Sequence, residues 1–278
     1  MSEPLASTAS APLVLYHGDC IDGFGAAWAA WRRLRDRAEY REVHHDEAPP
    51  DVDGRAVMIL DFAYPRGTLL AMAEQASELV VIDHHKTARD ALVGLEFCRF
   101  DLERSGAVLA WEHFHPGEPV PELLLHVQDK DLWQWQLAGT AEIIAALRSY
   151  PMDFARWSQW VDDWETGGAK LRAEGVAILR YEREVIRALV RGATERTLGG
   201  YRILAANAPL LQSEVANVLA EGRPFGVAWY EAQDRRFFSL RSREEGIDVA
   251  ELARQFGGGG HPRAAGFSRA RGEPDPLD

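Results

Sequence analysis

Three short apolar runs alternate with helical sequence in the first third of the chain, and they constrain the fold more than any other feature. The runs occupy residues 13–16, 56–60 and 79–82, and they are apolar throughout rather than alternately apolar and polar. Such runs are typical of strands covered on both faces, as in a parallel sheet between two layers of helices. A helical pattern over 66–77 separates the second run from the third. We therefore predict an α/β fold that begins with a parallel sheet.

Acidic and histidine residues follow each predicted strand. Ligands of parallel sheets lie beyond the carboxyl ends of the strands, which is where these side chains are expected. A single aspartate at the end of a strand is more often a turn or helix-capping residue than a ligand. Capping and turns do not readily explain why three consecutive strands all end in such residues. The residues are His17, Asp19 and Asp22 after the first run, Asp61 after the second, and Asp83, His84 and His85 after the third.

This set of side chains predicts a centre for divalent cations. Carboxylates and imidazoles, with no thiolate among them, suit Mn²⁺ or a similar ion better than a structural zinc. Two ions about 3.5–4 Å apart, bridged by one carboxylate, can activate a water and neutralise the charge of a phosphoryl group. Asp61 follows the middle run and is the natural bridging candidate.

Composition argues against several other classes of protein. The chain has a net charge of −12 and two cysteines, so neither a disulfide scaffold nor a zinc–thiolate site is expected. No apolar run approaches the roughly 20 residues that cross a bilayer, and residues 1–11 lack the pattern of a signal peptide. We therefore expect a cytoplasmic protein with no membrane partner. The acidity also argues against binding to long duplex DNA.

The acidic charge is concentrated in the first part of the chain, which indicates two domains with different tasks. Residues 12–165 contain 14 basic and 27 acidic side chains, whereas residues 200–272 contain 10 basic and 8 acidic ones. The sequence pattern changes at about the same place. Helical sequence over 105–149 and 153–195 gives way to strand-like runs at 201–205, 225–230 and 237–241.

Four glycines at 257–260 precede His261 near the end of the chain. Glycine lets a backbone approach a phosphate or base closely, and successive amide groups can form an anion-binding nest. A flexible linker is the alternative, but the position between a predicted helix at 248–255 and strand-like sequence favours binding. Arg241, at the end of a strand-like run, can bind a phosphate through two hydrogen bonds.

Two further groups of residues are expected to be structural. His44 and His45 precede two prolines, which favours a surface loop. Trp28, Trp31 and Trp111 lie in helical sequence and are expected to pack between helices.

Motifs along nearly the whole chain resemble those of the DHH phosphoesterases. The sequence VIDHHKT at 81–87 resembles the motif that defines the family. HGDCIDG at 17–23 and LDF at 60–62 are similar to the first and second motifs, and QDKDLW at 128–133 lies where the fourth is expected. SLR at 239–241 and GGGGH at 257–261 resemble the substrate motif of the DHHA1 domain. The likeness is greatest to members that degrade short oligoribonucleotides (nanoRNase type).

The resemblance implies a role for each of these residues. It implies one cation held by His17, Asp19 and Asp61, and a second held by Asp22, Asp61, His84 and Asp129. It also implies that His85 faces the scissile phosphate and that Asp83 orients its neighbours, both as catalytic residues. The substrate-binding residues that it implies are Arg241, Gly258, Gly259, Gly260 and His261.

Two of these assignments have alternatives in the sequence itself. The family's first motif separates its two aspartates by one residue, whereas Cys20 and Ile21 both lie between Asp19 and Asp22. Either the loop bulges to accommodate the extra residue or Asp19 is not a ligand. In the fourth motif, Asp131 lies two residues after Asp129 and competes with it.

We therefore expect a DHH metal-binding catalytic domain over 12–152, a helical connector over 153–199, a smaller α/β DHHA1 substrate-binding domain over 200–268, and disordered tails at 1–11 and 269–278. The expected reaction is hydrolysis of short single-stranded RNA or DNA (nanoRNA) to mononucleotides, with two Mn²⁺ per chain and Mg²⁺ or another divalent ion as the alternative. Other candidate substrates are cyclic dinucleotides and 3′-phosphoadenosine 5′-phosphate. A non-catalytic, nucleotide-binding regulatory module is the alternative of another class. The oligomeric state is not predicted.

Overall fold

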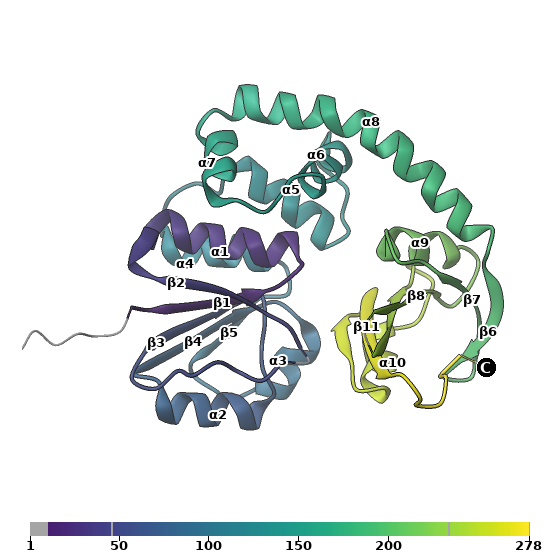
Figure 1. Cartoon of the computed structure of the whole chain (residues 1–278), viewed down its shortest axis with the longest axis horizontal. Helices are drawn as coiled ribbons and strands as arrows, with labels where there is room; N and C mark the ends of the chain where they lie inside the picture. The colour runs from purple at the N-terminus through teal and green to yellow at the C-terminus, as the bar shows by residue number, and fades with distance from the viewer. Residues whose placement is uncertain (1–10, 46, 233, 278) are drawn as a thin grey trace, which may run out of the picture. The chain divides into compact units, whose positions relative to one another are not determined.

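The computed structural model describes residues 11–45, 47–232 and 234–277 (Figure 1). By their contacts these residues form two compact units. The first comprises the residues up to His84 together with Ala91–Val176, and the second comprises His85–Asp90 together with the residues from Ala177 onward. Each unit has one β-sheet; the first unit has a hydrophobic core and the second has two, one on each face of its sheet.

The sheet of the first unit is parallel and confirms the predicted fold class. Its order is β2-β1-β3-β4-β5, so that β3 lies at the centre between β1 and β4. The three apolar runs form β1, β3 and β4, whereas the two edge strands escape the sequence pattern because β2 is largely polar and β5 has only 3 residues. The strands are β1 (Leu13–His17), β2 (Glu39–Val43), β3 (Ala56–Leu60), β4 (Glu78–Asp83) and β5 (Cys98–Phe100).

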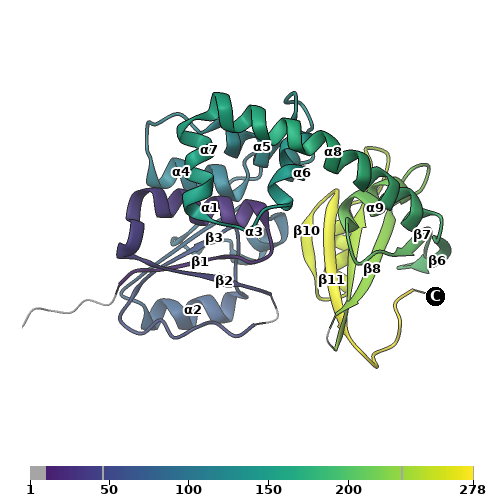
Figure 2. The same cartoon turned by 45° about the horizontal axis from the view of Figure 1, so that its top comes forward.

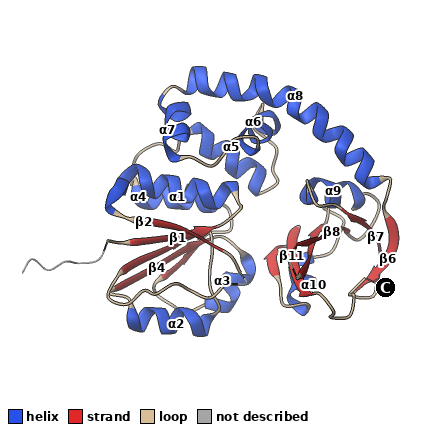
Figure 3. Ribbon diagram, in the orientation of Figure 1, coloured by secondary structure: helices blue, strands red, loops and turns tan. Residues whose placement is uncertain are grey.

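Helices cover both faces of this sheet, as predicted (Figures 1 and 3). Helices α1 (Ile21–Leu34) and α4 (Gly106–Phe114) pack together on one face, and α2 (Arg66–Gln75) lies on the other. Trp28 is fully buried and stacks on Trp111, with ring centroids 5.7 Å apart. These two tryptophans therefore pack between helices, as the sequence predicts.

Further helices extend the core of the first unit. Three of these helices are α5 (Glu122–Asp131), α6 (Thr140–Arg148) and α7 (Phe154–Asp162). The long helix α8 (Trp164–Val190) starts on the same core, and the division between the two units falls within it. The chain also has the short helices η1 (Arg35–Arg37) and α3 (Lys86–Leu92). Within the described ranges, no helix combines the length and the apolar character needed to cross a membrane.

The second unit contains a six-stranded sheet in the order β10-β11-β9-β8-β7-β6 (Figure 2). Neighbouring strands are antiparallel except for the parallel pair β7 and β8. Alternate side chains serve two cores: Ile203 packs with helix α10 (Val249–Gln255), and Ala206 packs with helix α9 (Gln212–Leu219). The strands are β6 (Thr194–Leu198), β7 (Tyr201–Asn207), β8 (Gly226–Ala232), β9 (Arg235–Arg241), β10 (Gly259–His261) and β11 (Ala264–Ala270).

The structure differs from the predicted domain organisation in two places. The predicted helical connector included residues 194–198, but these residues form the edge strand β6. Leu198 of this strand is fully buried in the core that contains helix α10. Residues 269–277, predicted as a disordered tail, pack against the sheet. Leu277 is 8% exposed and belongs to the core that contains helix α10, and Asp275 forms a salt bridge with Arg236. Residues 1–10 of the other predicted tail lie outside the described residues.

Candidate metal centre

The three predicted strand ends meet at one edge of the first sheet. Strands β1, β3 and β4 are adjacent and parallel, so the residues that follow them leave the sheet at the same edge. The strand order reverses between β1 and β3, and α/β sheets bind ligands outside such a switch point. Asp61 follows β3 directly, and its backbone N–H donates to the Ile82 carbonyl at 2.9 Å. The central strand of the sheet therefore presents Asp61 at the switch point.

Asp61 lies between two imidazoles. Its Oδ2 atom is 3.5 Å from His17 Nδ1, and its Oδ1 atom is 3.0 Å from His84 Nε2. The residue is 1% exposed, and Gly106 makes room for it: a Cβ at Gly106 would lie 2.6 Å from Asp61 Oδ1. The two oxygens of Asp61 thus face different histidines, as expected of a carboxylate that bridges two cations.

Carboxylates surround His84 Nε2. Besides Asp61, this atom has Asp22 Oδ2 at 3.6 Å and Asp131 Oδ2 at 3.5 Å. The first turn of α4 holds Asp22 in place, because the backbone N–H groups of Gly106 and Ala107 donate to its two oxygens at 2.6 and 3.1 Å. One ligand atom each from Asp22, His84 and Asp131 lie within 4.8 Å of one another, which is close enough to share one cation.

The pKa values of the buried groups indicate a demand for positive charge. Burial raises the pKa of Asp22 well above its usual value, and the charges of Asp61 and Asp131 raise it further. Burial alone would lower the pKa of His84, but the hydrogen bond to Asp61 and the charge of Asp131 raise it well above its usual value. A similar balance raises the pKa of His17. A divalent cation bound here would replace these protons as the source of positive charge.

Asp129 is close to the centre in sequence, but its carboxylate is used elsewhere. It accepts hydrogen bonds from Gln136 N at 2.7 Å, Leu137 N at 3.0 Å and Thr140 Oγ1 at 2.6 Å, and so anchors the loop between α5 and α6. It belongs to none of the potential cation-binding groups found among the described residues, whereas Asp131 does. Two residues on a helix differ in direction by about 200°, so only one of the two aspartates can face His84. The structure favours Asp131 over the predicted Asp129.

The first motif also differs from its expected form. Asp19 is exposed, has a left-handed φ of 53°, and belongs to none of the potential ligand groups in the described part of the chain. Cys20 lies there instead: one ligand atom each from His17, Cys20 and Asp61 lie within 4.8 Å of one another. A thiol is therefore among the candidate donors, in addition to the carboxylates and imidazoles that the sequence predicts.

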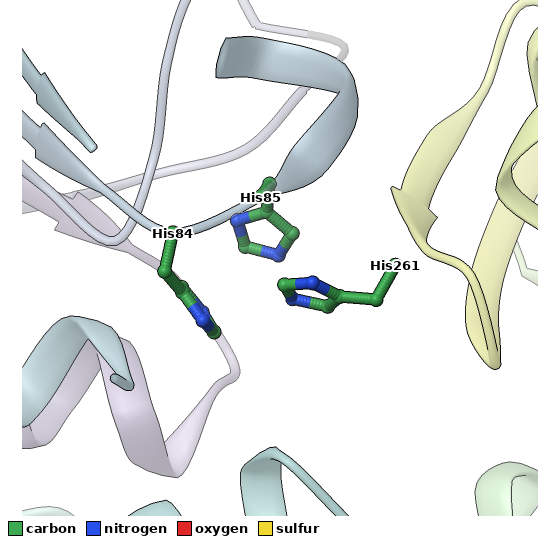
Figure 4. Close-up of side chains that lie close together, drawn as sticks. All are labelled: His84, His85 and His261. Carbon is green, nitrogen blue, oxygen red and sulfur yellow. The ribbon is translucent and has the colours of Figure 1, made fainter. Parts of the chain in front are cut away.

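The side chains of His84 and His85, the two histidines of the Asp-His-His motif, lie close together (Figure 4). Asp83 is 1% exposed, and its Oδ1 atom accepts a hydrogen bond from the backbone N–H of His84 at 2.7 Å, which fixes the turn that directs His84 toward Asp61. His85 belongs by its contacts to the second unit, where its ring stacks on that of His261 with centroids 4.8 Å apart (Figure 4).

Two of the predicted substrate-binding residues share one face of the second sheet. Ala264 of β11 pairs with Arg241 of β9 on one side and with His261 of β10 on the other. Residues directly opposite one another in antiparallel strands point to the same face, so Arg241 and His261 do as well. The guanidinium of Arg241 donates to Ser213 Oγ at 2.5 Å and to the Leu240 carbonyl at 2.8 Å, which restricts its orientation.

Part of the glycine-rich run, which the sequence predicts as an anion-binding nest, forms a strand. Gly259 and Gly260 lie in β10, and the N–H groups of Gly258 and Gly260 donate to the Ala253 carbonyl at 3.0 Å and to Thr87 Oγ1 at 3.1 Å. A Cβ at Gly258 would lie 2.0 Å from a backbone oxygen of β11. Close approach of backbone to backbone therefore explains a glycine here.

Two residues close to the candidate ligands, His45 and Gly106, were not predicted from the sequence. His45 is exposed, as expected of a surface loop, but its ring lies 5.5 Å from that of His17 and 4.6 Å from that of Phe62. The position of His45 just after β2 could have identified it. Strand β2 pairs with β1 in parallel, so both strands end at the same edge of the sheet. No sequence signal identifies Gly106, because its role depends on how closely α4 approaches Asp61.

Comparisons with known proteins agree with this architecture. Residues 213–273 match the DHHA1 domain. Uncharacterized protein R106 of Acanthamoeba polyphaga mimivirus is 30% identical over 284 residues, which cover 92% of this chain and 67% of the viral protein.

Solved structures share the fold at low sequence identity. The DHH domain of PF0399, a member of the s1p family of ribosomal proteins, is 14% identical, with a TM-score of 0.57 over 94% of this chain and 83% of that one. The pGpG-specific phosphodiesterase PggH of Vibrio cholerae is 14% identical, with a TM-score of 0.48 over 94% of both chains, a likeness too loose to bear on activity. The chain therefore belongs to the same family as the viral protein, carries a DHHA1 domain over residues 213–273 and shares the fold of a DHH domain.

Proposed function

We propose that this chain is a metal-dependent phosphoesterase that hydrolyses short oligonucleotides to mononucleotides, with two divalent cations as cofactors and Mn²⁺ as the expected ion. The position of Asp61 carries the proposal. Its Oδ2 atom faces His17 and its Oδ1 atom faces His84, so one carboxylate serves two groups of potential ligands. Paired cations would supply an activated water and neutralise the charge of the phosphoryl group.

The surrounding residues hold the ligands in fixed positions. The N–H groups at the start of α4 bind both oxygens of Asp22, and Asp83 binds the backbone of His84. Side chains that are already held by hydrogen bonds lose little conformational entropy when a cation binds. The same hydrogen bonds also orient their ligand atoms toward the cation. We assign His85 to the scissile phosphate as a hydrogen-bond donor, since it is only partly buried and follows a ligand directly.

The second unit provides groups suited to the end of a nucleotide chain. Arg241 and His261 share a sheet face, and Arg241 is held by Ser213 so that its orientation is restricted before a phosphate binds. Charge supports a short substrate: residues 12–165 contain 27 acidic and only 14 basic side chains, which would repel a long polyanion. A few nucleotides bound at a local cationic group avoid that repulsion.

The proposal is tested by incubating the full chain with Mn²⁺ and end-labelled RNAs of two to five nucleotides, with cyclic dinucleotides and 3′-phosphoadenosine 5′-phosphate in parallel reactions. We expect release of mononucleotides from the short RNAs, and loss of that release in Asp61→Asn. The matched control is Asp53→Asn, since Asp53 is exposed and precedes β3, at the opposite end of the strand from Asp61.

Three results would contradict the proposal in different ways. Faster hydrolysis of the cyclic dinucleotide or of the bisphosphate would change the substrate and keep the chemistry. Full activity of Asp61→Asn would refute the bridging role. Nucleotide binding with no hydrolysis of any substrate would favour a regulatory module.

A further inference from the structure

We propose that Cys20 supplies a sulfur ligand to the cation on the His17 side of Asp61, so that this position favours thiophilic divalent ions over Mg²⁺. The inference rests on the proposed cation centre and concerns which residue completes it. It replaces Asp19, the residue that the sequence predicts for this place.

Geometry distinguishes the two neighbouring residues. One ligand atom each of His17, Cys20 and Asp61 lie within 4.8 Å of one another, so a single ion can contact all three. Asp19 is exposed and has a left-handed backbone with φ of 53°, and among the described residues it joins no such group. The extra residue in the first motif therefore places Asp19 in the bulge of the loop and Cys20 at the centre.

The local backbone places Cys20 at the start of a helix without using its side chain there. Cys20 is the N-cap residue of α1, with φ of −122° and ψ of 131°, and its side chain makes no capping hydrogen bond. Serine, threonine, aspartate and asparagine stabilise this position through such a bond, so a cysteine gives up that stabilisation. The loop is closed tightly, because a Cβ at Gly23 would lie 2.3 Å from the His17 carbonyl oxygen. The backbone thus brings the thiol beside the His17 ring without any help from capping.

The start of α1 then serves both cation positions. Cys20 joins His17 and Asp61, whereas Asp22, two residues later, joins His84 and Asp131. The second position offers mainly carboxylate oxygens, which suit Mg²⁺ or Mn²⁺. The first offers sulfur and nitrogen as well as oxygen, and soft thiolate ligands favour ions such as Zn²⁺ and Co²⁺. The same loop therefore contributes to two cation positions with different ligand types.

Cobalt titration of the full chain tests the ligand directly, without reference to activity. Co²⁺ bound to a thiolate gives a near-ultraviolet charge-transfer band that oxygen and nitrogen ligands do not give. We expect this band in the wild type, in Cys98→Ser and in Asp19→Asn, and its loss in Cys20→Ser and Cys20→Asp. Cys98 is the only other cysteine of the chain, which makes Cys98→Ser the matched control.

A second measurement covers a variant that fails to fold. In Cys98→Ser, Cys20 is the only thiol, and its reaction with a disulfide reagent should slow when Co²⁺ is added and remain unchanged when Mg²⁺ is added. Calorimetry distinguishes the two ways of failing. Binding of two Co²⁺ ions with no band, and no protection of the thiol, would overturn the role of Cys20 and leave the phosphoesterase proposal standing. Absence of any cation binding would overturn both.

Discussion

The exchange of Asp129 for Asp131 can be tested with a matched pair of variants, because the two aspartates have opposite tasks in the structure. Asp129 accepts two hydrogen bonds from the loop between α5 and α6 and a third from Thr140 at the start of α6, and it is 3% exposed. Asp131 makes its close approach to His84, at 3.5 Å, and its side chain is 18% exposed. Asp129→Asn and Asp131→Asn each remove one charge from the same helix. Their effects should nevertheless separate into stability and cation binding.

The structure sets the expected magnitudes. Buried donors that lose their acceptor cost about 1–3 kcal/mol each, and an amide keeps only one acceptor oxygen for the three donors, so Asp129→Asn should lower the free energy of unfolding by about 2–4 kcal/mol. Asp131→Asn removes a charge that repels Asp22, so its cost without cations should stay below about 1 kcal/mol. A cation at 100 times its dissociation constant stabilises the fold by about 2.7 kcal/mol. Asp129→Asn should retain this gain, and Asp131→Asn should lose most of it.

Urea unfolding of both variants, with a chelator and then with saturating Mn²⁺, measures the two quantities together. The wild type in both conditions gives the reference for the cation-dependent gain. An unchanged gain in Asp131→Asn would refute the reasoning, as would a variant Asp129→Asn that is fully stable in chelator but gains nothing from Mn²⁺. Either outcome would return the ligand role to Asp129.

Three other predictions follow from single contacts. Gly106→Ala should weaken Mn²⁺ binding about 10–100-fold in calorimetry, because the added Cβ would lie 2.6 Å from the Asp61 carboxylate and displace it; unchanged binding would show that α4 moves aside freely. Gly258→Ala should destabilise the second unit by about 1–3 kcal/mol in urea unfolding, since its Cβ would lie 2.0 Å from the Gly266 carbonyl oxygen, and an unaltered midpoint would contradict the close packing of β10. Mn²⁺ affinity should fall as the pH decreases from 8 to 6, because the raised pKa of His17 keeps a proton that the cation must release, and a flat profile would argue against His17 as a ligand.

Much of the first sheet and the identity of its site could be predicted from sequence. Buried parallel strands are continuous apolar runs, so β1, β3 and β4 are visible as such, and the chemistry follows them directly in the chain. Strands β3 and β4 are successive and adjacent, as short right-handed connections favour, whereas β1 lies beside β3 because the strand order reverses there. Asp61 and His84 are found together for this reason.

Edge strands and the ends of the second unit could not be predicted in the same way. Strand β2 is polar because one edge of a sheet lies near solvent, and so the nearness of His45 to His17 was hidden. The residues around Leu277 are rich in proline and acid, which indicates disorder, yet one buried leucine ties them to the core that contains helix α10. Glycines 258–260 look alike in sequence whether they bind an anion or allow two strands to approach.

The sequence by itself identified the loops that carry the candidate ligands, and only the tertiary structure showed which residue of each loop lies among the others. Asp19 and Cys20 are adjacent in the sequence, and Asp129 and Asp131 are two positions apart. All four side chains are chemically suited to bind a cation. The choice within each pair depends on where the loop bulges and on the rotation of α5 about its axis. Helix α5 packs through Leu123, Leu124 and Val127 on the core that contains Trp28, and no local pattern records such long-range packing. Local sequence specifies chemistry and strand position, whereas the direction of a side chain is settled by long-range contacts.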